Sequence, residues 1–444
     1  MTLVFSLILG LLVLGILVLV HELGHFLAAK ACKIKVLTFS IGFGRALIKK
    51  KYGDTEYRLS SIPFGGYVRM AGDNPEEQRS GSPDEFNSKP VWQRAVVALA
   101  GPVANLVFAV LLLWFIFIYG VARPVYMDNL NIGGVIENSS AQEAGFLPGD
   151  SILAINNQTV ESWDDIENHF TRQQKQYEFT ILRNNTTYDK TLNIEYSESG
   201  LPQQPVGGLL PPVPAVIGGI NPDSPAEQAQ LEKQDSVIAI NGENVYSFYH
   251  LSTLINNHNR EELPLTFTVK RGDTVLNKEI TPEFNSEKET YIIGITVASP
   301  ETELVRFSPL AAIPMSMEKT WEYTTMIFQV IGQLISREVS TNQLAGPLGI
   351  IPASGLMAMQ GLSPILNFMA LIGINLAVLN LLPLVITDGG MLFFLGLEAI
   401  RKKPLSPKTQ ANINKVAIIF FLALFLFVSI NDVKRLPEIL RIFN

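Results

Sequence analysis

The stretch His21-Glu22-Leu23-Gly24-His25 decides how the chain is interpreted, and it follows an uncharged apolar run from Thr2 to Val20. Residues four apart share one face of a helix, so His21 and His25 can offer two imidazoles to one metal ion. Glu22 lies beside this pair and can act as a general base. This spacing is typical of zinc metalloproteases. The alternative, that these residues are polar groups ending a membrane span, is less favoured because Lys and Arg suit that position better.

Composition indicates a membrane protein with a substantial aqueous part. The 444 residues are 47% hydrophobic and 17% charged. The net charge of −7 leaves no basic surface for nucleic acid. A single cysteine, Cys32, excludes an internal disulfide. No basic residue precedes the first apolar run, so we expect a retained span rather than a signal peptide.

The apolar runs predict four membrane spans with an aqueous segment between the second and third. The fourth run, Val416 to Ile430, is short and must borrow residues near Gln410. The predicted segments are a first span with the histidine motif (1–30), a cytoplasmic loop with β-structure (31–93), a second span (94–122), two periplasmic repeats (127–209 and 213–300), amphipathic helices (301–360), a third span (361–390), a cytoplasmic loop (391–409), a fourth span (410–431) and a tail (432–444).

Lysine and arginine predict the orientation in the membrane. The loop after the first span and the loop between the third and fourth spans are both rich in these residues, which places them in the cytoplasm. The termini and the repeats then lie outside, in the periplasm of a Gram-negative cell. Basic residues after the fourth span argue weakly the other way. His21 is therefore expected within the membrane, near its cytoplasmic side.

The first loop combines β-forming residues with glycines, most clearly in Thr38 to Gly44. Tyr57 to Ser61 and Gly66 to Met70 read as further short strands. Strands near a membrane need their backbone groups satisfied by protein, so we expect a small sheet beside the metal site. An exposed sheet edge there could pair with an extended peptide. A plain cytosolic hairpin remains an equal alternative.

An internal repeat fills the segment between the second and third spans. Gly134 and Gly219 begin two similar stretches, and Asp150 and Asp235 recur in them at the same offset of 85 residues. Each copy predicts a strand, a short helix, a turn and another strand. The proline-rich stretch 210–214 marks the joint between the copies.

A third metal ligand is expected at the end of the third span. Pro383 ends that helix, and Gly389 and Gly390 allow a tight turn. Asp388 should therefore lie on an irregular segment level with the two histidines, leaving a zinc ion one open position. The alternative is that Asp388 is the N-cap of a helix beginning at Met391. Gly101 and Asn105 in the second span predict close helix packing rather than catalysis.

These motifs together resemble the site-2 protease family of intramembrane zinc proteases, and the repeats look like PDZ domains. The resemblance implies a polytopic α-helical membrane protein of four spans, with a membrane-associated β-loop and two periplasmic PDZ domains, in a bacterial inner membrane. It implies one zinc ion held by His21, His25 and Asp388, with Glu22 as the base. Asn380 and Pro383 would hold the substrate, with help from the β-loop residues Gly42, Phe43 and Gly44.

The same resemblance implies the partners. The substrate would be a single-span membrane protein, such as an anti-sigma factor already trimmed outside the membrane by another protease. The PDZ pair would act as a size filter or bind peptide tails. The protease would work as a monomer within the lipid bilayer.

Three positions depart from the family pattern. Val385 stands where a second proline is usual, and Met391 replaces a histidine common in near relatives. Gln230 and Gln234 in the second repeat replace Gly145 and Gly149 of the first. Turns with positive φ would be strained at these glutamines, which weakens the expectation of peptide binding there.

A rival class is a non-catalytic membrane scaffold with PDZ repeats and a structural metal. A closed structural site would need a fourth protein ligand, for which the sequence offers no good candidate. An ion transporter is weaker still, because the predicted spans carry almost no charge outside the site.

Overall fold

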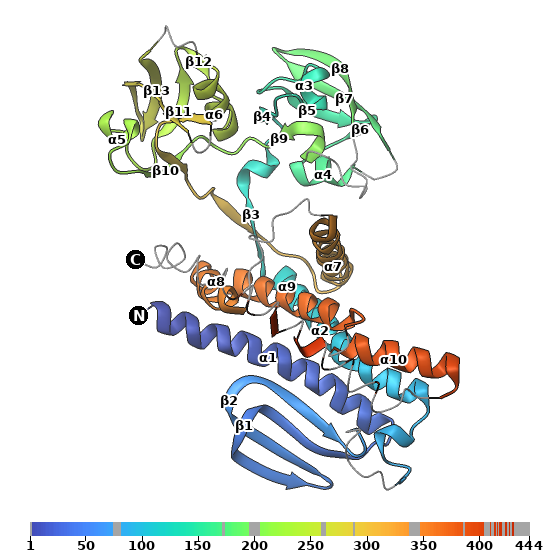
Figure 1. The fold of residues 1–444 in the computed structure, drawn as a ribbon. Helices are drawn as coiled ribbons and strands as arrows, with labels where there is room; N and C mark the ends of the chain where they lie inside the picture. Colours follow the sequence, from blue (N-terminus) through green and yellow to red (C-terminus); the bar gives the residue numbers. More distant parts are fainter. Residues whose placement is uncertain are drawn as a thin grey trace. The chain divides into compact units, whose positions relative to one another are not determined.

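The structure is a computed structural model. It describes residues 2–403 except 74–80, 171–173, 195–204, 259–262, 287–288, 337–346 and 385–386, together with scattered residues between 409 and 429. The chain divides into two compact units (Figure 1). The first unit combines Met1–Val121 with Val305–Asn444, and the second is Ala122–Leu304.

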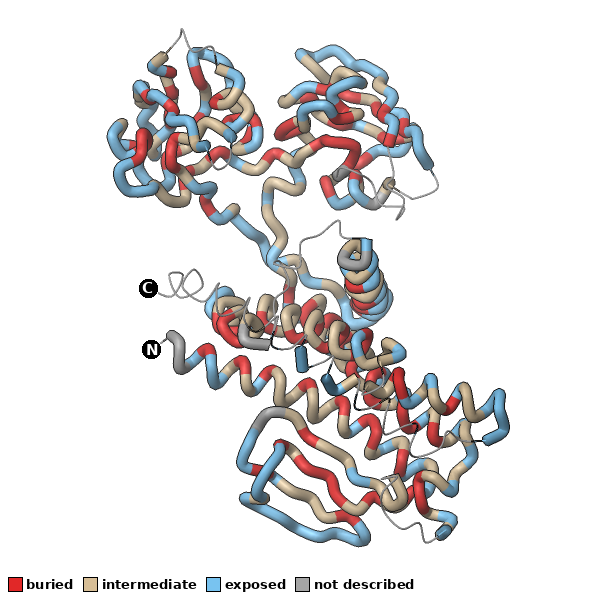
Figure 2. The backbone as a smooth tube through the Cα atoms, viewed as in Figure 1, coloured by how far each residue is buried: buried red, intermediate tan, exposed pale blue. Residues whose placement is uncertain are grey.

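Within the described part of the first unit, three helices are long and apolar enough to cross a membrane. They are α1 (Thr2–Ala31), α2 (Val91–Tyr119) and α9 (Leu362–Leu381). Buried residues recur along each of them (Figure 2), and those of α9 form apolar clusters with buried residues of α2 and of α1. Gly24 permits a close approach of α1 to α2, since a Cβ there would lie 2.2 Å from the carbonyl oxygen of Ala100. The first three predicted spans therefore match candidate helices, while the fourth lies largely outside the described residues.

Three further helices belong to this unit: α7 (Ala312–Ser336), α8 (Pro347–Gln360) and α10 (Asp388–Arg401). The first two agree with the helices predicted for 301–360, although that segment begins with a strand, β18 (Thr302–Val305). β18 pairs with β3 (Val121–Pro124). Ile327 of α7 packs into the apolar cluster formed by α2 and α9. α10 occupies most of the predicted second cytoplasmic loop.

Two long bent strands follow α1, in place of the three short strands predicted. β1 (Val36–Tyr52) and β2 (Thr55–Met70) pair antiparallel, and both fold back so that Thr38 pairs with Glu56 on one side and with Arg69 on the other. Gly42 and Gly44 carry φ angles of 85° and 87° at the bend of β1, a conformation that favours glycine. The folding back leaves the last strand segment, Gly66 to Met70, at one edge next to α1.

The second unit contains the two repeats, and each holds a four-stranded antiparallel sheet of the same order, β6-β5-β7-β8 and β12-β11-β13-β14. The elements of the first repeat are β4 (Gly134–Val135), α3 (Ser140–Glu143), β5 (Ser151–Ile155), β6 (Gln158–Thr159), α4 (Trp163–Asn168), β7 (Gln176–Arg183), β8 (Thr186–Asn193) and β9 (Leu209–Leu210). Those of the second are β10 (Ile217–Ile220), α5 (Pro225–Gln228), β11 (Ser236–Ile240), β12 (Glu243–Asn244), α6 (Phe248–Asn256), β13 (Leu265–Arg271), β14 (Thr274–Ile280), β15 (Glu283–Asn285), β16 (Thr290–Ile292) and β17 (Ile295–Val297).

The aspartates that revealed the repeat make the same contacts in both copies. Arg183 reaches Asp150 with Nε–Oδ1 and Nη2–Oδ2 distances of 2.5 and 2.6 Å, and Arg271 reaches Asp235 at 2.7 and 2.8 Å. Both aspartates are buried, so each bidentate ion pair fixes the turn before the first sheet strand.

That turn keeps its backbone shape in both repeats although its residues differ. Gly145 and Gly149 have φ angles of 74° and 91°, and Gln230 and Gln234 have φ angles of 57° and 71°. The second repeat therefore places glutamine in the left-handed region, as predicted. The effect of this strain on peptide binding stays a prediction.

Candidate metal centre

The two histidines lie one turn apart on α1, an unbroken helix through the motif. Their side chains point the same way, and the rings meet edge to face with centroids 4.7 Å apart. The Nε2 atoms are 3.2 Å apart. Only 7% of His21 and 9% of His25 is exposed, so both imidazoles are withdrawn from the surface of the protein.

The segment after α9 delivers the third side chain. Thr387 donates its hydroxyl to the carbonyl oxygens of Leu382 and Leu384, 2.9 and 2.7 Å away, beyond the helix end that Pro383 enforces. A Cβ on Gly389 would lie 2.2 Å from the Leu382 carbonyl oxygen, so only glycine allows this tight return. Val385 lies outside the described residues.

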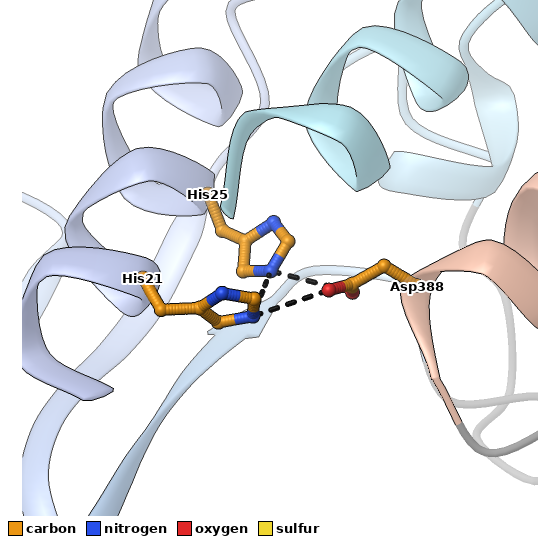
Figure 3. A group of neighbouring side chains, drawn as sticks. All are labelled: His21, His25 and Asp388. Atoms are coloured by element: carbon orange, nitrogen blue, oxygen red, sulfur yellow. Dashed lines mark hydrogen bonds and ion pairs between the residues drawn. The ribbon is translucent and has the colours of Figure 1, made fainter. Parts of the chain in front are cut away.

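Asp388 is the first residue of α10, and the N-cap position belongs to Thr387. The prediction of an irregular segment at Asp388 is therefore wrong. The helix α10 already begins at Asp388, so Gly389 and Gly390 lie in its first turn and not in the turn before it. The alternative of Asp388 as the N-cap of a helix from Met391 is wrong as well. The carboxylate instead projects from the first turn of α10 toward α1 (Figure 3).

His21, His25 and Asp388 converge on one point, as Figure 3 shows. His21 Nε2 lies 3.1 Å from Asp388 Oδ2, and His25 Nε2 lies 3.3 Å from Asp388 Oδ1. Ligands of a tetrahedral zinc ion with bonds of about 2.0–2.1 Å are separated by about 3.3–3.4 Å. The spacing and the donor set of two imidazoles and one carboxylate therefore fit zinc. Among the described residues this is the one such cluster found.

Hydrogen bonding supports the same conclusion for His25. Its Nδ1 lies 2.7 Å from the carbonyl oxygen of Val97, an acceptor, so Nδ1 carries the proton. In the neutral ring, Nε2 then carries no proton, and its lone pair is directed at His21 and Asp388. A ring nitrogen held this way is the usual arrangement of a metal-binding histidine.

A cleft of about 380 Å³ opens beside the three side chains. Glu22 and Asn380 line it, as their predicted roles require. Tyr67, Val68 and Met70 form the wall contributed by the edge of β2. The sequence predicted that Gly66 to Met70 belong to a small sheet beside the metal site, but it named Gly42, Phe43 and Gly44 as the substrate-binding residues of that sheet.

Four predicted substrate-binding residues do not line this cleft: Pro383, Gly42, Phe43 and Gly44. Phe43 is nevertheless one contact away, because its ring stacks on Tyr67 with centroids 6.1 Å apart. Gly42 and Gly44 form the bend that carries Phe43, and Pro383 ends α9 before the loop that leads to Asp388.

The helix α2 packs directly behind the two imidazoles. A Cβ on Gly101 would lie 2.3 Å from His25 Nε2 and 2.8 Å from His21 Cε1, so the rings occupy the space of the missing side chain. At the start of the same helix Arg94 forms a two-bond ion pair with Glu398 of α10, with an Nη1–Oε2 distance of 3.1 Å. The helix therefore contacts both the histidines and the helix that carries Asp388.

Comparison with known proteins agrees with this geometry. The model of peptidase family M50 matches residues 9–424. The chain is 33% identical to the regulator of sigma-E protease RseP of Escherichia coli K12, over 95% of this chain and 97% of the relative. It is 32% identical to the protein of the same name from Salmonella typhimurium and to a putative zinc metalloprotease of Neisseria meningitidis, over the same shares of each chain.

These matches span nearly the whole chain and do not favour the rival interpretation as a non-catalytic scaffold. With the apolar helices, they describe a multi-pass protein of the inner membrane whose substrates are membrane proteins. The chain belongs to peptidase family M50 and is a zinc metalloprotease of the intramembrane site-2 type.

Proposed function

We propose that His21, His25 and Asp388 hold the zinc ion and that Glu22 is the general base in hydrolysis of a peptide bond within a membrane span. The observation that carries this proposal is the convergence of three ligand atoms from α1 and α10 beside the cleft that Glu22 lines. When bound, zinc supplies a Lewis acid and lowers the pKa of its water to about 7. Glu22 takes a proton from the attacking water and passes it to the leaving amine.

The substrate must be extended to react, because a helix keeps its carbonyl oxygens in i to i+4 hydrogen bonds. The edge segment Gly66 to Met70 supports this step, since it forms one wall of the cleft and ends a folded sheet. An extended substrate would pair with that edge. Asn380, which also lines the cleft, would hydrogen-bond the substrate, and Phe43 would act through the ring of Tyr67.

For the remaining architecture we propose four spans, with 410–431 as the fourth, and PDZ domains in the two repeats, with both termini and the repeats in the periplasm. The shared sheet order of the repeats and the basic loops support this arrangement. The relatives named for sigma-E regulation favour a substrate of the anti-sigma-factor type, trimmed before it enters. The repeats would exclude larger proteins or bind peptide tails.

The test uses the full chain with a co-expressed single-span substrate. Glu22→Gln should retain zinc and lose cleavage, by roughly 10²–10⁴-fold for loss of a general base. Asp388→Asn should lose both. Glu318→Gln, an exposed acid of α7 in the same unit, is the matched control and should change neither. Retained cleavage in Glu22→Gln would refute the assignment of the base.

A further inference from the structure

We propose that Asn105 of α2 is a positioning residue that holds the His21 imidazole through Nδ1, so that its Nε2 faces the metal. The proposal rests on the metal role of His21 given above. It assigns Asn105, which the sequence suggested only for packing, to the support of the zinc site.

Asn105 has no exposed surface, and its side-chain nitrogen lies 3.5 Å from His21 Nδ1. Its oxygen Oδ1 is also buried and has no hydrogen-bond partner among the described residues. An amide buried in a span is costly unless its polar atoms are satisfied. The Asn105 amide therefore needs a nearby hydrogen-bond partner, and His21 is the polar group beside it.

The position of the ring proton on His21 indicates which hydrogen bond Asn105 Oδ1 can form. Its Nε2 faces His25 and Asp388, so a metal bound there leaves the ring proton on Nδ1. An N–H group cannot bond to the amide nitrogen, because both are donors. The oxygen and nitrogen of an amide have nearly the same shape, and rotation by 180° exchanges them. In the rotated amide, Oδ1 accepts the Nδ1 proton and is no longer unpaired.

The other histidine provides an internal comparison. His25 donates its Nδ1 proton to the backbone carbonyl of Val97, which also belongs to α2. Val97, Gly101 and Asn105 are spaced four apart and share one face of that helix. Gly101 lets the helix approach, while Val97 and Asn105 each provide an acceptor for one imidazole. One face of α2 thus orients both rings.

The experiment measures zinc affinity of the full chain in detergent by competition with a chelator, for Asn105→Leu and Asn105→Asp. Leucine has a similar volume and no acceptor, and we expect affinity to fall about 10–100-fold, as for other groups that support a metal ligand. Aspartate restores an acceptor for Nδ1–H and should keep affinity close to that of the unchanged protein. The absorption spectrum of the cobalt-loaded protein should change in the leucine variant only.

Asn367→Leu is the matched control. Asn367 lies on α9, where its Oδ1 accepts a hydrogen bond from the Tyr323 hydroxyl at 3.0 Å, away from the histidines. The control should lose no zinc affinity. Equal losses in Asn105→Leu and Asn105→Asp would mean that Asn105 only fills space, and unchanged affinity in both would mean that His21 needs no support. Either result would overturn the proposal.

A separate variant distinguishes this proposal from the assignment of the metal site itself. Asp388→Ala should lower zinc affinity strongly. Undiminished affinity in Asp388→Ala would remove the proposed site altogether, whereas a loss there with none in Asn105→Leu would remove only the role of Asn105.

Discussion

The two units of the molecule differ in how far apart in the sequence their interacting buried side chains lie. In the membrane unit, the metal cluster joins residues from the two ends of the chain, and no second copy of it exists among the described residues. In the repeat unit, each buried aspartate pairs with an arginine of the same repeat, and the pair occurs twice. A metal site assembled from distant parts of the chain should lose its function after one substitution. Loss of one of the two repeated ion pairs should instead lower stability only partly.

Removal of the metal tests this contrast most strongly. A chelator should abolish cleavage of a single-span substrate, and added zinc should restore it, because no described side chain replaces the ion. Hydrogen exchange in the repeat unit should stay unchanged, since its sheets contain no metal cluster among the described residues. Cleavage that survives complete metal removal would contradict both the site and the contrast.

Substitution of Gly101 sharpens the comparison by changing the site through its packing. The added methyl group of Gly101→Ala would lie 2.3 Å from His25 Nε2, so the ring must move and zinc affinity should fall about 10–100-fold. Gly396→Ala on α10 is the control, because no atom lies within 4 Å of its new methyl group. A chelator competition that finds equal affinities for the two variants would contradict the model of the site.

Lowering the pH should gradually reduce the stability of the second repeat. Burial raises the pKa of Asp235, but hydrogen bonds from Arg271 and from the Glu232 backbone outweigh it and hold the pKa below its usual value. A carboxyl group with a lowered folded-state pKa stabilises the fold above its unfolded pKa of about 3.9, and that contribution disappears as pH falls through the folded value.

Hydrogen exchange in β11 and β13, corrected for the intrinsic effect of pH on exchange, should therefore show weakening protection below pH ~4. Arg271→Gln should reduce this dependence, because the carboxylate loses its strongest partner. An unchanged pH profile in that variant would show that the ion pair does not stabilise the repeat.

The smallest effect is expected at the turns that differ between the repeats. Gln234→Gly should stabilise the second repeat by up to about 1 kcal/mol, because glycine removes the cost of the left-handed conformation but adds entropy to the unfolded chain. Gly149→Gln should destabilise the first repeat by more, since its Cβ would lie 2.6 Å from the Tyr246 ring. Hydrogen exchange of β5 and β11 measures both, and effects of the same sign would contradict the comparison.

Much of the site could be predicted because its chemistry is carried by short local patterns. Residues four apart on a helix identified the histidines, and a proline followed by paired glycines identified the region of Asp388. The N-terminal boundary of α10 could not be predicted, because Thr387 caps that helix through its backbone conformation rather than through a side-chain hydrogen bond. The offset of 85 residues identified the repeats because their turns require matching aspartates.

The sequence predicted a sheet beside the site, but not which of its residues line the cleft, nor the role of Asn105. Tyr67 and Val68 line the same cleft as Glu22 only because β1 and β2 both fold back, and the register of bent strands follows from tertiary packing. Asn105 meets His21 because Gly24 and Gly101 let two helices approach closely. A pattern within one helix carries no information about which atom of a second helix it will face.

The separation of the proposed metal ligands along the chain also bears on when the enzyme can become active. During synthesis, His21 and His25 leave the ribosome well before Asp388, the third proposed ligand. A nascent chain that has not reached Asp388 therefore lacks one of the three proposed ligands. Peptide-bond cleavage by the proposed site would therefore begin only after Asp388 has been made and has joined the two histidines.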